Sequence, residues 1–249
     1  MRKSSLALCA LALWIGAAAQ AVATESVPVV VQPSGPEAPA NLLRISLMFA
    51  QPVDGDVLPR LELRQANGKV IDKPFLDQEL WSPSGKVLTV LLDPARVKSG
   101  LIAHNTFGPV LRDDELVVLM LDGEAIKRWR IGADDHDGPK PALWKLGNAR
   151  AHTREPLVAE LDAPIDGRDV EYLVVADWQG KRVAGRAVLL DGERRWSFLP
   201  AVPWRAGTYQ LAVFSQLEDA SGNRMGGHFE ETAGTQRPST DTVLTFTVR

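Results

Sequence analysis

The sequence predicts an all-β protein made of two tandem β-sandwich domains. Short apolar segments alternate with polar residues at a period of two, as in strands with one buried face. Pairs such as Asp54-Gly55, Asn67-Gly68 and Ser84-Gly85 separate these segments and favour tight turns. A second set of the same motifs follows about 112 residues after the first, so the two halves look like a duplication. A unit of about 110 residues has the size of a β-sandwich, and few segments have the period of a helix.

Residues 1–23 have the features of a cleaved signal peptide. Two basic residues precede an apolar run over residues 6–19, and Ala21-Val22-Ala23 follows at the positions that signal peptidase reads. The apolar run is shorter than the roughly 20 residues that span a bilayer. We therefore expect export and cleavage after Ala23, which removes two basic residues and changes the net charge from −3 to −5. Cleavage also removes Cys9, the only cysteine, so the mature chain can form no disulfide or cysteine-ligated metal site.

Residues 24–40 are rich in Val, Pro, Ser, Gly and Glu without alternation, and they predict an extended leader. The first domain is predicted over residues 41–132. Its strands are expected around the alternating Leu43, Ile45, Leu47 and Phe49 and at residues 58–63, 87–92, 116–121 and 126–131. Asp122-Gly123 lies between the last two segments and predicts a hairpin.

A linker is predicted over residues 133–150, and a second sandwich over residues 151–249. The motifs of the second half repeat those of the first in the same order. Gln51-Pro52-Val53-Asp54-Gly55 is matched by Ala163-Pro164-Ile165-Asp166-Gly167, Gly68-Lys69 by Gly180-Lys181, and residues 91–94 and Gly100 by residues 198–200 and Gly207. The order indicates two copies, each with its own core.

The second half also resembles a known family. Its motifs are Pro164-Ile165-Asp166 after an apolar strand, Trp196-Ser197-Phe198-Leu199-Pro200, Trp204, Gly207-Thr208-Tyr209, and Asp219-Ala220-Ser221-Gly222-Asn223. This pattern is similar to that of bacterial Ig-like domains of the SbsA type, over about residues 155–249. The first half matches only in part and lacks the Asp-x-x-Gly-Asn turn, so it resembles a diverged copy. The resemblance implies two tandem Ig-like β-sandwich domains after a cleaved signal peptide, and the family carries no shared catalytic residues.

A weaker resemblance is to the CopC-type periplasmic copper proteins, which share the apolar strand, the Pro-hydrophobic turn and the Gly-Lys hairpin. That family binds copper through histidines, one of them at the mature N-terminus. Here the expected mature N-terminus is Thr24, and the four histidines stand singly at positions 104, 136, 152 and 228. The resemblance therefore gives no support for copper binding.

Two polar segments could bind a ligand or could be structural. Residues 134–138 contain three aspartates and a histidine, which could ligate a hard cation. The segment departs from a calcium loop, because Ala133 and Trp144 stand at the first and twelfth positions, so a solvated acidic linker is favoured. Asp219 and Asn223 flank Gly222, and local hydrogen bonding in a tight turn is favoured over a ligand role.

Six tryptophans remain after the signal peptide: Trp81, Trp129, Trp144, Trp178, Trp196 and Trp204. Most are expected in the cores, and Trp196 alternates with Phe198 on a strand. Trp178 lies beside Gly180 at an expected hairpin tip, so we expect it to be exposed. An exposed tryptophan offers a flat apolar face with an N–H group, so Trp178 is the tentative contact for a sugar ring or a partner protein.

The sequence contains no Gly-x-Ser-x-Gly elbow, His-Glu-x-x-His motif or phosphate-binding glycine loop. Its slight negative charge without a basic block argues against nucleic acid. We therefore expect an exported, periplasmic or secreted, non-catalytic Ig-like module without a cofactor or a membrane span, which binds cell-envelope or secreted proteins or scaffolds the envelope. The alternative is a small-ligand module for carbohydrate or a metal ion. A third hypothesis is a hydrolase with a site between the domains, lined by His152 or His228.

Overall fold

The first sandwich consists of two four-stranded sheets. The computed structural model describes residues 29–227 and 240–249. One sheet is antiparallel, has the order β1-β3-β6-β5, and contains β1 (Val29–Gln32), β3 (Arg44–Phe49), β5 (Leu80–Trp81) and β6 (Val87–Leu91). The other has the order β2-β8-β7-β4 and contains β2 (Glu37–Pro39), β4 (Leu61–Gln65), β7 (Leu116–Leu121) and β8 (Glu124–Gly132). Alternate residues such as Leu47, Leu63 and Leu119 point inward, where they form one buried core.

The second sandwich pairs a four-stranded sheet with a three-stranded sheet. The larger sheet has the order β12-β13-β10-β9 and contains β9 (Lys145–Leu146), β10 (Leu157–Glu160), β12 (Gly185–Leu190) and β13 (Arg195–Pro200). The smaller has the order β11-β14-β15 and contains β11 (Leu173–Asp177), β14 (Gly207–Val213) and β15 (Thr242–Val248). Its core is aromatic: Trp204 lies between Phe198, Tyr209 and Phe246, with ring centroids 5.2–6.1 Å apart. Such ring clusters stabilise a core beyond their area burial.

The strand order identifies both sandwiches as Ig-like. Lettered from A to G, the second domain places A, B, E and D in one sheet and C, F and G in the other, which is the constant-type Ig arrangement. The first domain has the same arrangement plus the short β2, which runs parallel to the last strand, β8. The prediction of two Ig-like sandwiches is therefore confirmed.

The helical elements are short and lie in connections. They are η1 (Leu58–Arg60), α1 (Pro94–Val97), α2 (Ile102–Phe107), η2 (Pro141–Leu143) and η3 (Gly167–Tyr172). Asp93 caps α1, because its side chain accepts a hydrogen bond from the amide of Ala95. Helices α1 and α2 occupy the connection between β6 and β7, so the expected match of Gly100 with Gly207 is wrong. Gly100 precedes α2, whereas Gly207 begins β14.

Most strands predicted from alternation are present. β3, β6, β7 and β8 lie within a few residues of the predicted segments, and the Asp122-Gly123 hairpin joins β7 to β8. The segment expected at residues 58–63 is divided, because η1 takes its first three residues and β4 begins at Leu61. Gly55, Gly68 and Gly85 all have positive φ, as the turn pairs predicted.

The leader prediction is wrong for residues 29–40, and the linker prediction is wrong for part of residues 133–150. β1 and β2 lie within the expected leader, where they pair with β3 and β8 of the first domain. β9 lies within the expected linker and pairs with β10. These strands have two to four residues, too few for alternation to mark them, and backbone pairing holds them in place. Residues 1–28, which include the expected signal peptide, lie outside the described residues.

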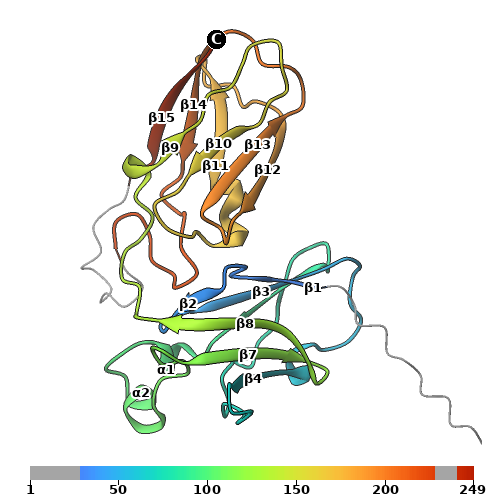
Figure 1. Cartoon of the computed structure of the whole chain (residues 1–249), viewed down its shortest axis with the longest axis vertical. Coiled ribbons are helices and arrows are strands. Elements are labelled where there is room, and N and C mark those ends of the chain that lie inside the picture. The colour runs from blue at the N-terminus through green and yellow to red at the C-terminus, as the bar shows by residue number, and fades with distance from the viewer. Residues whose placement is uncertain (1–28, 228–239) are drawn as a thin grey trace, which may run out of the picture.

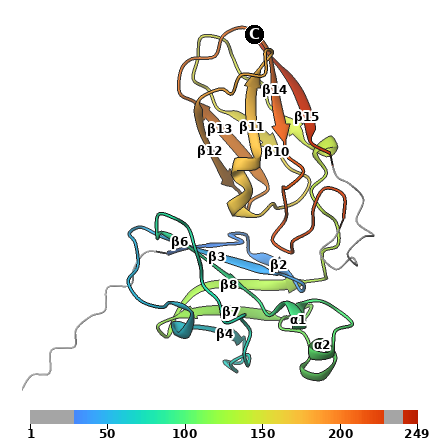
Figure 2. The ribbon, with the colours of Figure 1, turned by 180° about the vertical axis from the view of Figure 1, so that it is seen from behind.

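The second domain stands on one face of the first. In Figures 1 and 2 one end of its sandwich meets the first domain on the side of β1 and β3, and the chain ends at the opposite end of the second domain. Ser46 of β3 and Thr89 of β6 point out of the first domain, yet both are buried and their hydroxyls hydrogen bond at 3.1 Å. The second domain therefore covers the part of the outer face around Ser46 and Thr89. Among the described residues no helix is long and apolar enough to cross a bilayer.

Candidate functional site at the junction of the domains

Three connections of the second domain form its contact with the first domain. They are residues 161–172 between β10 and β11, residues 191–194 between β12 and β13, and the described part of the connection between β14 and β15, residues 214–227. The carbonyl of Ala220 accepts hydrogen bonds from the amides of Leu43 and Arg44, at 3.0 and 3.1 Å, and its side chain packs against the core of the first domain. Backbone-to-backbone hydrogen bonds thus join the two domains.

Asn41 ties the linker to both domains. Its Nδ2 donates to the carbonyl of Asp135 (2.7 Å), and its Oδ1 accepts from the amide of Asp135 (2.8 Å). Asn223 Nδ2 of the second domain donates to the same carbonyl (2.8 Å), and Ser221 Oγ donates to Asn41 Oδ1 (3.3 Å). Asn41, Ser221 and Asn223 are buried, so each bond satisfies a polar group that water cannot reach.

Asp219 forms the turn that carries these contacts. Its Oδ1 accepts from the amides of Ser221 and Asn223, at 2.8 and 2.9 Å, and its Oδ2 accepts from Asn223 Nδ2 at 2.8 Å. Gly222 has a φ of 85°, which glycine adopts without strain. The predicted turn-forming role of Asp219 and Asn223 is confirmed, and the turn also joins the two domains.

A network of charged side chains crosses the junction. Arg44 of the first domain contacts Asp166 (Nη1 to Oδ2, 3.4 Å) and Glu218 of the second domain. Asp166 also binds Arg168 (3.0 Å), and Glu218 also binds Arg224 (2.7 Å). Both carboxylates are buried, and each is paired with two guanidinium groups, which is how a protein tolerates buried charge. We call these five residues the junction network.

A third connection adds a buried carboxylate. Glu193 accepts hydrogen bonds from Gln32 Nε2 (3.3 Å) and from the amide of Ser34 (2.8 Å), both in the first domain. Gly192 lies so close that a Cβ on it would be 2.9 Å from Gly35 Cα. The backbones of the two domains therefore touch here without an intervening side chain.

Two aspartates at the junction have raised pKa values. Burial raises the pKa of Asp169 from 3.8 to about 7, with a further contribution from the negative charge of Asp166. Burial likewise raises the pKa of Asp219 to about 7, although its hydrogen bonds from Asn223 and Ser221 oppose the shift. Asp169 accepts a hydrogen bond from the amide of Glu218 at 2.9 Å, and Asp219 is the next residue along the chain. Both aspartates therefore contact or belong to the connection after β14, which reaches the first domain.

These pKa values predict a protein that is more stable in mild acid. Between about pH 4 and 7 the folded chain holds protons on Asp169 and Asp219 that the unfolded chain has released, so stability falls as the pH rises through this range. We expect a higher melting temperature at about pH 5.5 than at about pH 8. Thermal melts over this range check the expectation. Asp219→Asn should reduce the change of melting temperature with pH. An equal change in the variant and the natural protein would contradict the role assigned to Asp219.

The described part of the junction encloses one small cavity beside the junction network. The cavity lined by Arg44, Ser46, Pro164 and Asp166 has a volume of about 20 Å³, which suffices for about one water molecule. His152, one histidine of the hydrolase hypothesis, lies at the opposite end of the second domain, where its amide donates to the carbonyl of Trp204. His228 lies outside the described residues. The described part of the junction thus does not contain the cleft that the hydrolase hypothesis requires.

The acidic linker is held by its backbone. A Cβ on Gly138 would lie 1.9 Å from the carbonyl oxygen of Arg224, so the linker runs directly against the second domain. The side chains of Asp134, His136 and Asp137 are largely exposed. Over residues 29–227 and 240–249 no group of three or more His, Cys, Asp or Glu residues could hold a metal ion.

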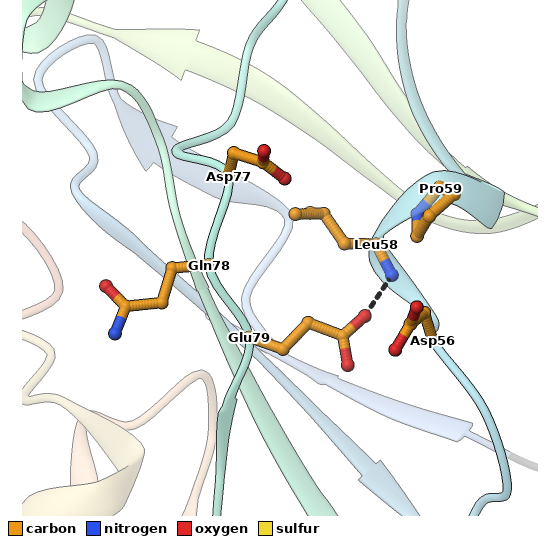
Figure 3. A pocket seen from close by; sticks show the side chains of 6 residues that line it. All are labelled: Asp56, Leu58, Pro59, Asp77, Gln78 and Glu79. Atoms are coloured by element: carbon orange, nitrogen blue, oxygen red, sulfur yellow. Dashed lines mark hydrogen bonds between the residues drawn. The ribbon is translucent and has the colours of Figure 1, made fainter.

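A second acidic hollow lies in the first domain, shown in Figure 3. Asp56, Asp77 and Glu79 surround a space of about 350 Å³ beside η1. Glu79 Oε1 accepts from the amides of Val57 and Leu58 (2.6 and 2.5 Å), and its Oε2 accepts from Trp81 Nε1 (2.7 Å). Glu79 therefore fixes the connection before β4, and its oxygens are already occupied by donors of the chain.

Trp178 is exposed, as predicted. It follows Asp177 at the end of β11, and 71% of its surface is accessible. Asp177 Oδ1 accepts from the amides of Gln179 and Lys181, at 3.0 and 2.9 Å, which fixes the turn that presents the tryptophan. Trp129, Trp144, Trp196 and Trp204 are buried and Trp81 is partly buried. No ring contact within the described residues includes Trp178, and its role as a ligand contact stays a prediction.

The sequence singled out some junction residues and missed others. Asp166 and Asn223 belong to motifs that were recognised, although their contact with the first domain was not expected. Asn41, Arg44 and Glu193 were missed, because nothing near them in the sequence distinguishes them from exposed polar residues. Their partners are about 90 to 160 residues away, so only the packing of the domains shows their role.

No protein-family model and no curated protein matches the chain. Several solved structures match most of its length. The I-band fragment I67–I69 of titin is 7% identical, with 83% of this chain and 58% of the fragment covered, at a TM-score of 0.24. The adhesin InvE of Yersinia pseudotuberculosis is 13% identical, with 89% of this chain and 58% of the adhesin covered, at a TM-score of 0.24. The chain thus spans less than two thirds of either structure. The Ig-like assignment follows from the strand order of each domain, and these likenesses add nothing about function.

Proposed function

We propose that the chain is an exported, non-catalytic module of two SbsA-type Ig-like domains, which binds protein partners or scaffolds the cell envelope. The observation that carries this proposal is the closed polar junction. An enzyme needs polar groups that converge on an accessible cleft. Here the buried polar groups that cluster between the domains bind one another and leave space for about one water molecule. Their role is to fix the orientation of two sandwiches.

A fixed orientation suits a scaffold. In Ig variable domains, the connections between strands B and C and between F and G are ligand-binding loops. The equivalent B–C connection of the second domain and the described part of its F–G connection, residues 214–227, contact the first domain, so these segments are engaged within the chain. Binding must then use the sheet faces, the sheet edges or the opposite ends of the domains. A rigid pair presents such surfaces at a constant spacing without loss of conformational entropy on binding.

Export to the periplasm or the medium rests on the signal-like features of residues 1–23. We expect the protein from its native cells to begin at Thr24 and to be absent from the cytoplasmic fraction. Cell fractionation followed by mass spectrometry of the N-terminal peptide checks this. Detection of the uncleaved N-terminus on most molecules in the cytoplasm would contradict export.

Cross-linked capture from native cell envelopes tests the interaction role. Residues 24–249 serve as bait beside two variants, Arg44→Met in the junction network and Arg195→Met in an exposed pair. We expect the natural bait and Arg195→Met to capture the same protein in equal amounts. If that protein contacts both domains, Arg44→Met should capture less of it. Capture of no specific protein by any bait would overturn the proposal.

A further inference from the structure

The two sandwiches have four outer sheet faces, and two of them are charged. The outward residues of β4, β7 and β8 include the charged side chains Glu62, Arg64, Arg128 and Arg130. Those of β9, β10, β12 and β13 include the charged side chains Lys145, Glu160, Arg186 and Arg195. Mixed charge of this kind keeps an exposed sheet soluble. The third face is covered by the second domain around Ser46 and Thr89.

The fourth face, on β11, β14 and β15, has no charged side chain at its own outward positions, and all of these except Ala176 are exposed or partly exposed. The inward residues of these strands, such as Val175, Leu211 and Phe246, lie in the core, so the residues between them point outward. The strand register places the outward residues in three rows across the sheet: Val174, Ala212 and Val243; Ala176, Gln210 and Thr245; and Thr208 with Thr247. The nearest charged group in register is Arg182, which pairs with Ala176 at the rim. We call these eight residues the neutral face.

Trp178 lies at one end of the neutral face. Asp177 pairs with Tyr209, which is the neighbour of Thr208 in β14. The turn that follows Asp177 therefore lies beside the row formed by Thr208 and Thr247. The side chain of Asp177 fixes the turn, so the backbone at Trp178 is held in place before any ligand binds. The three threonines and Gln210 thus lie on the side of the face that is nearer to Trp178, and the apolar row of Val174, Ala212 and Val243 lies farther from it.

We propose that the neutral face and Trp178 form a binding site for an uncharged polysaccharide chain. The hydroxyl groups of the threonines and the amide of Gln210 can donate to and accept from the hydroxyl groups of sugars. The indole of Trp178 offers an apolar plane against which the C–H face of a pyranose ring can pack. This site is separate from the junction, and it goes beyond the function proposed above.

Charge complementarity selects this ligand over a protein. The eight positions of this face carry no carboxylate and no cation, so Arg182, at the rim beside Ala176, is the charged group in register that could pair with a charged partner. Protein interfaces have a core of large apolar side chains, whereas most residues here are small or hydroxylated. A neutral, hydroxyl-rich polymer matches both the charge and the hydrogen-bonding groups.

Affinity electrophoresis tests the proposal. Residues 24–249 are run in native gels that contain hydroxyethylcellulose, galactomannan or glucomannan, and in gels that contain alginate as the acidic comparison. We expect at least one neutral polysaccharide to retard the natural protein, and alginate to retard it less. Trp178→Ala should weaken the binding by about tenfold or more, as expected for loss of an aromatic anchor. Gln210→Glu, which places a charge on the central strand of the face, should abolish it.

Matched controls separate this site from general effects on the surface. Leu143→Ala removes another large apolar side chain that is 61% exposed, and Ser197→Glu places a charge at the centre of the opposite sheet. Both should bind like the natural protein. Retardation by none of the neutral polysaccharides, or unchanged binding by Trp178→Ala, overturns the proposal.

Light scattering adds a further check: a dimer that Trp178→Ala converts to monomer would show that a second copy occupies the face. None of these results bears on export or on envelope capture, which test the proposed function separately.

Discussion

Arg44→Met is expected to lower the free energy of unfolding by about 3–5 kcal/mol, because it leaves two buried carboxylates without their shared partner. The side chain of Arg44 is 17% exposed, and those of Asp166 and Glu218 are 4% and 11% exposed. Arg168 and Arg224 remain as partners, which places the effect toward the lower end of this range. Denaturant unfolding followed by circular dichroism measures the loss, and small-angle X-ray scattering should detect freer motion of the domains.

Arg195→Met is the matched control for Arg44→Met. Arg195 also bridges two carboxylates, Glu160 and Asp191, each at 2.8 Å. All three side chains are 41–58% exposed, so water screens the pairs and we expect a loss below about 1 kcal/mol. Equal losses for the two methionine variants would contradict the view that the junction network stabilises the contact of the domains.

Trp196→Ala is expected to destabilise the protein by about 3–5 kcal/mol, as large-to-small changes of buried aromatic residues do. Trp196 is completely buried on β13 and stacks on Phe198, with ring centroids 5.8 Å apart. Its Nε1 is buried and has no hydrogen-bond partner within the described residues. Trp196→Phe keeps an aromatic ring and removes this unsatisfied donor, so we expect a loss below about 1.5 kcal/mol.

The two variants of Trp196 are compared by denaturant unfolding. Leu199→Ala, on the same strand but facing solvent, should change stability by less than about 0.5 kcal/mol. Equal losses for Trp196→Ala and Trp196→Phe would contradict the expectation that the aromatic ring kept in Trp196→Phe supplies most of the stabilisation.

Alternation predicted the longer strands because each has one face in a core. β3, with Ile45, Leu47 and Phe49 inward, and β7 show this pattern for six residues. β1, β2 and β9 could not be found in the same way. They have four, three and two residues, and they are strands because a neighbour pairs with them.

The junction could be predicted only in part. The sequence identified the turns at Asp166 and at Asp219-Asn223 from their local chemistry, and the structure contains both turns. The burial of Asp166 depends on Arg44, about 122 positions away. No local pattern distinguishes a buried arginine from an exposed one, so the role of the network follows only from the packing of one domain on the other.

The shared strand order of the two domains bears on how copies of the chain could contact one another. The contact between the domains is heterologous, since the strand connections of the second domain meet the sheet of the first, and such contacts can propagate into open filaments. The first domain still exposes its own Asp54-Gly55 turn, the counterpart of Asp166-Gly167. The second domain, however, has Pro156 and Val158 where the first has Arg44 and Ser46. The second domain therefore lacks the arginine that pairs with Asp166 and the serine buried beneath it, so it cannot receive the same contact from another copy in the same way.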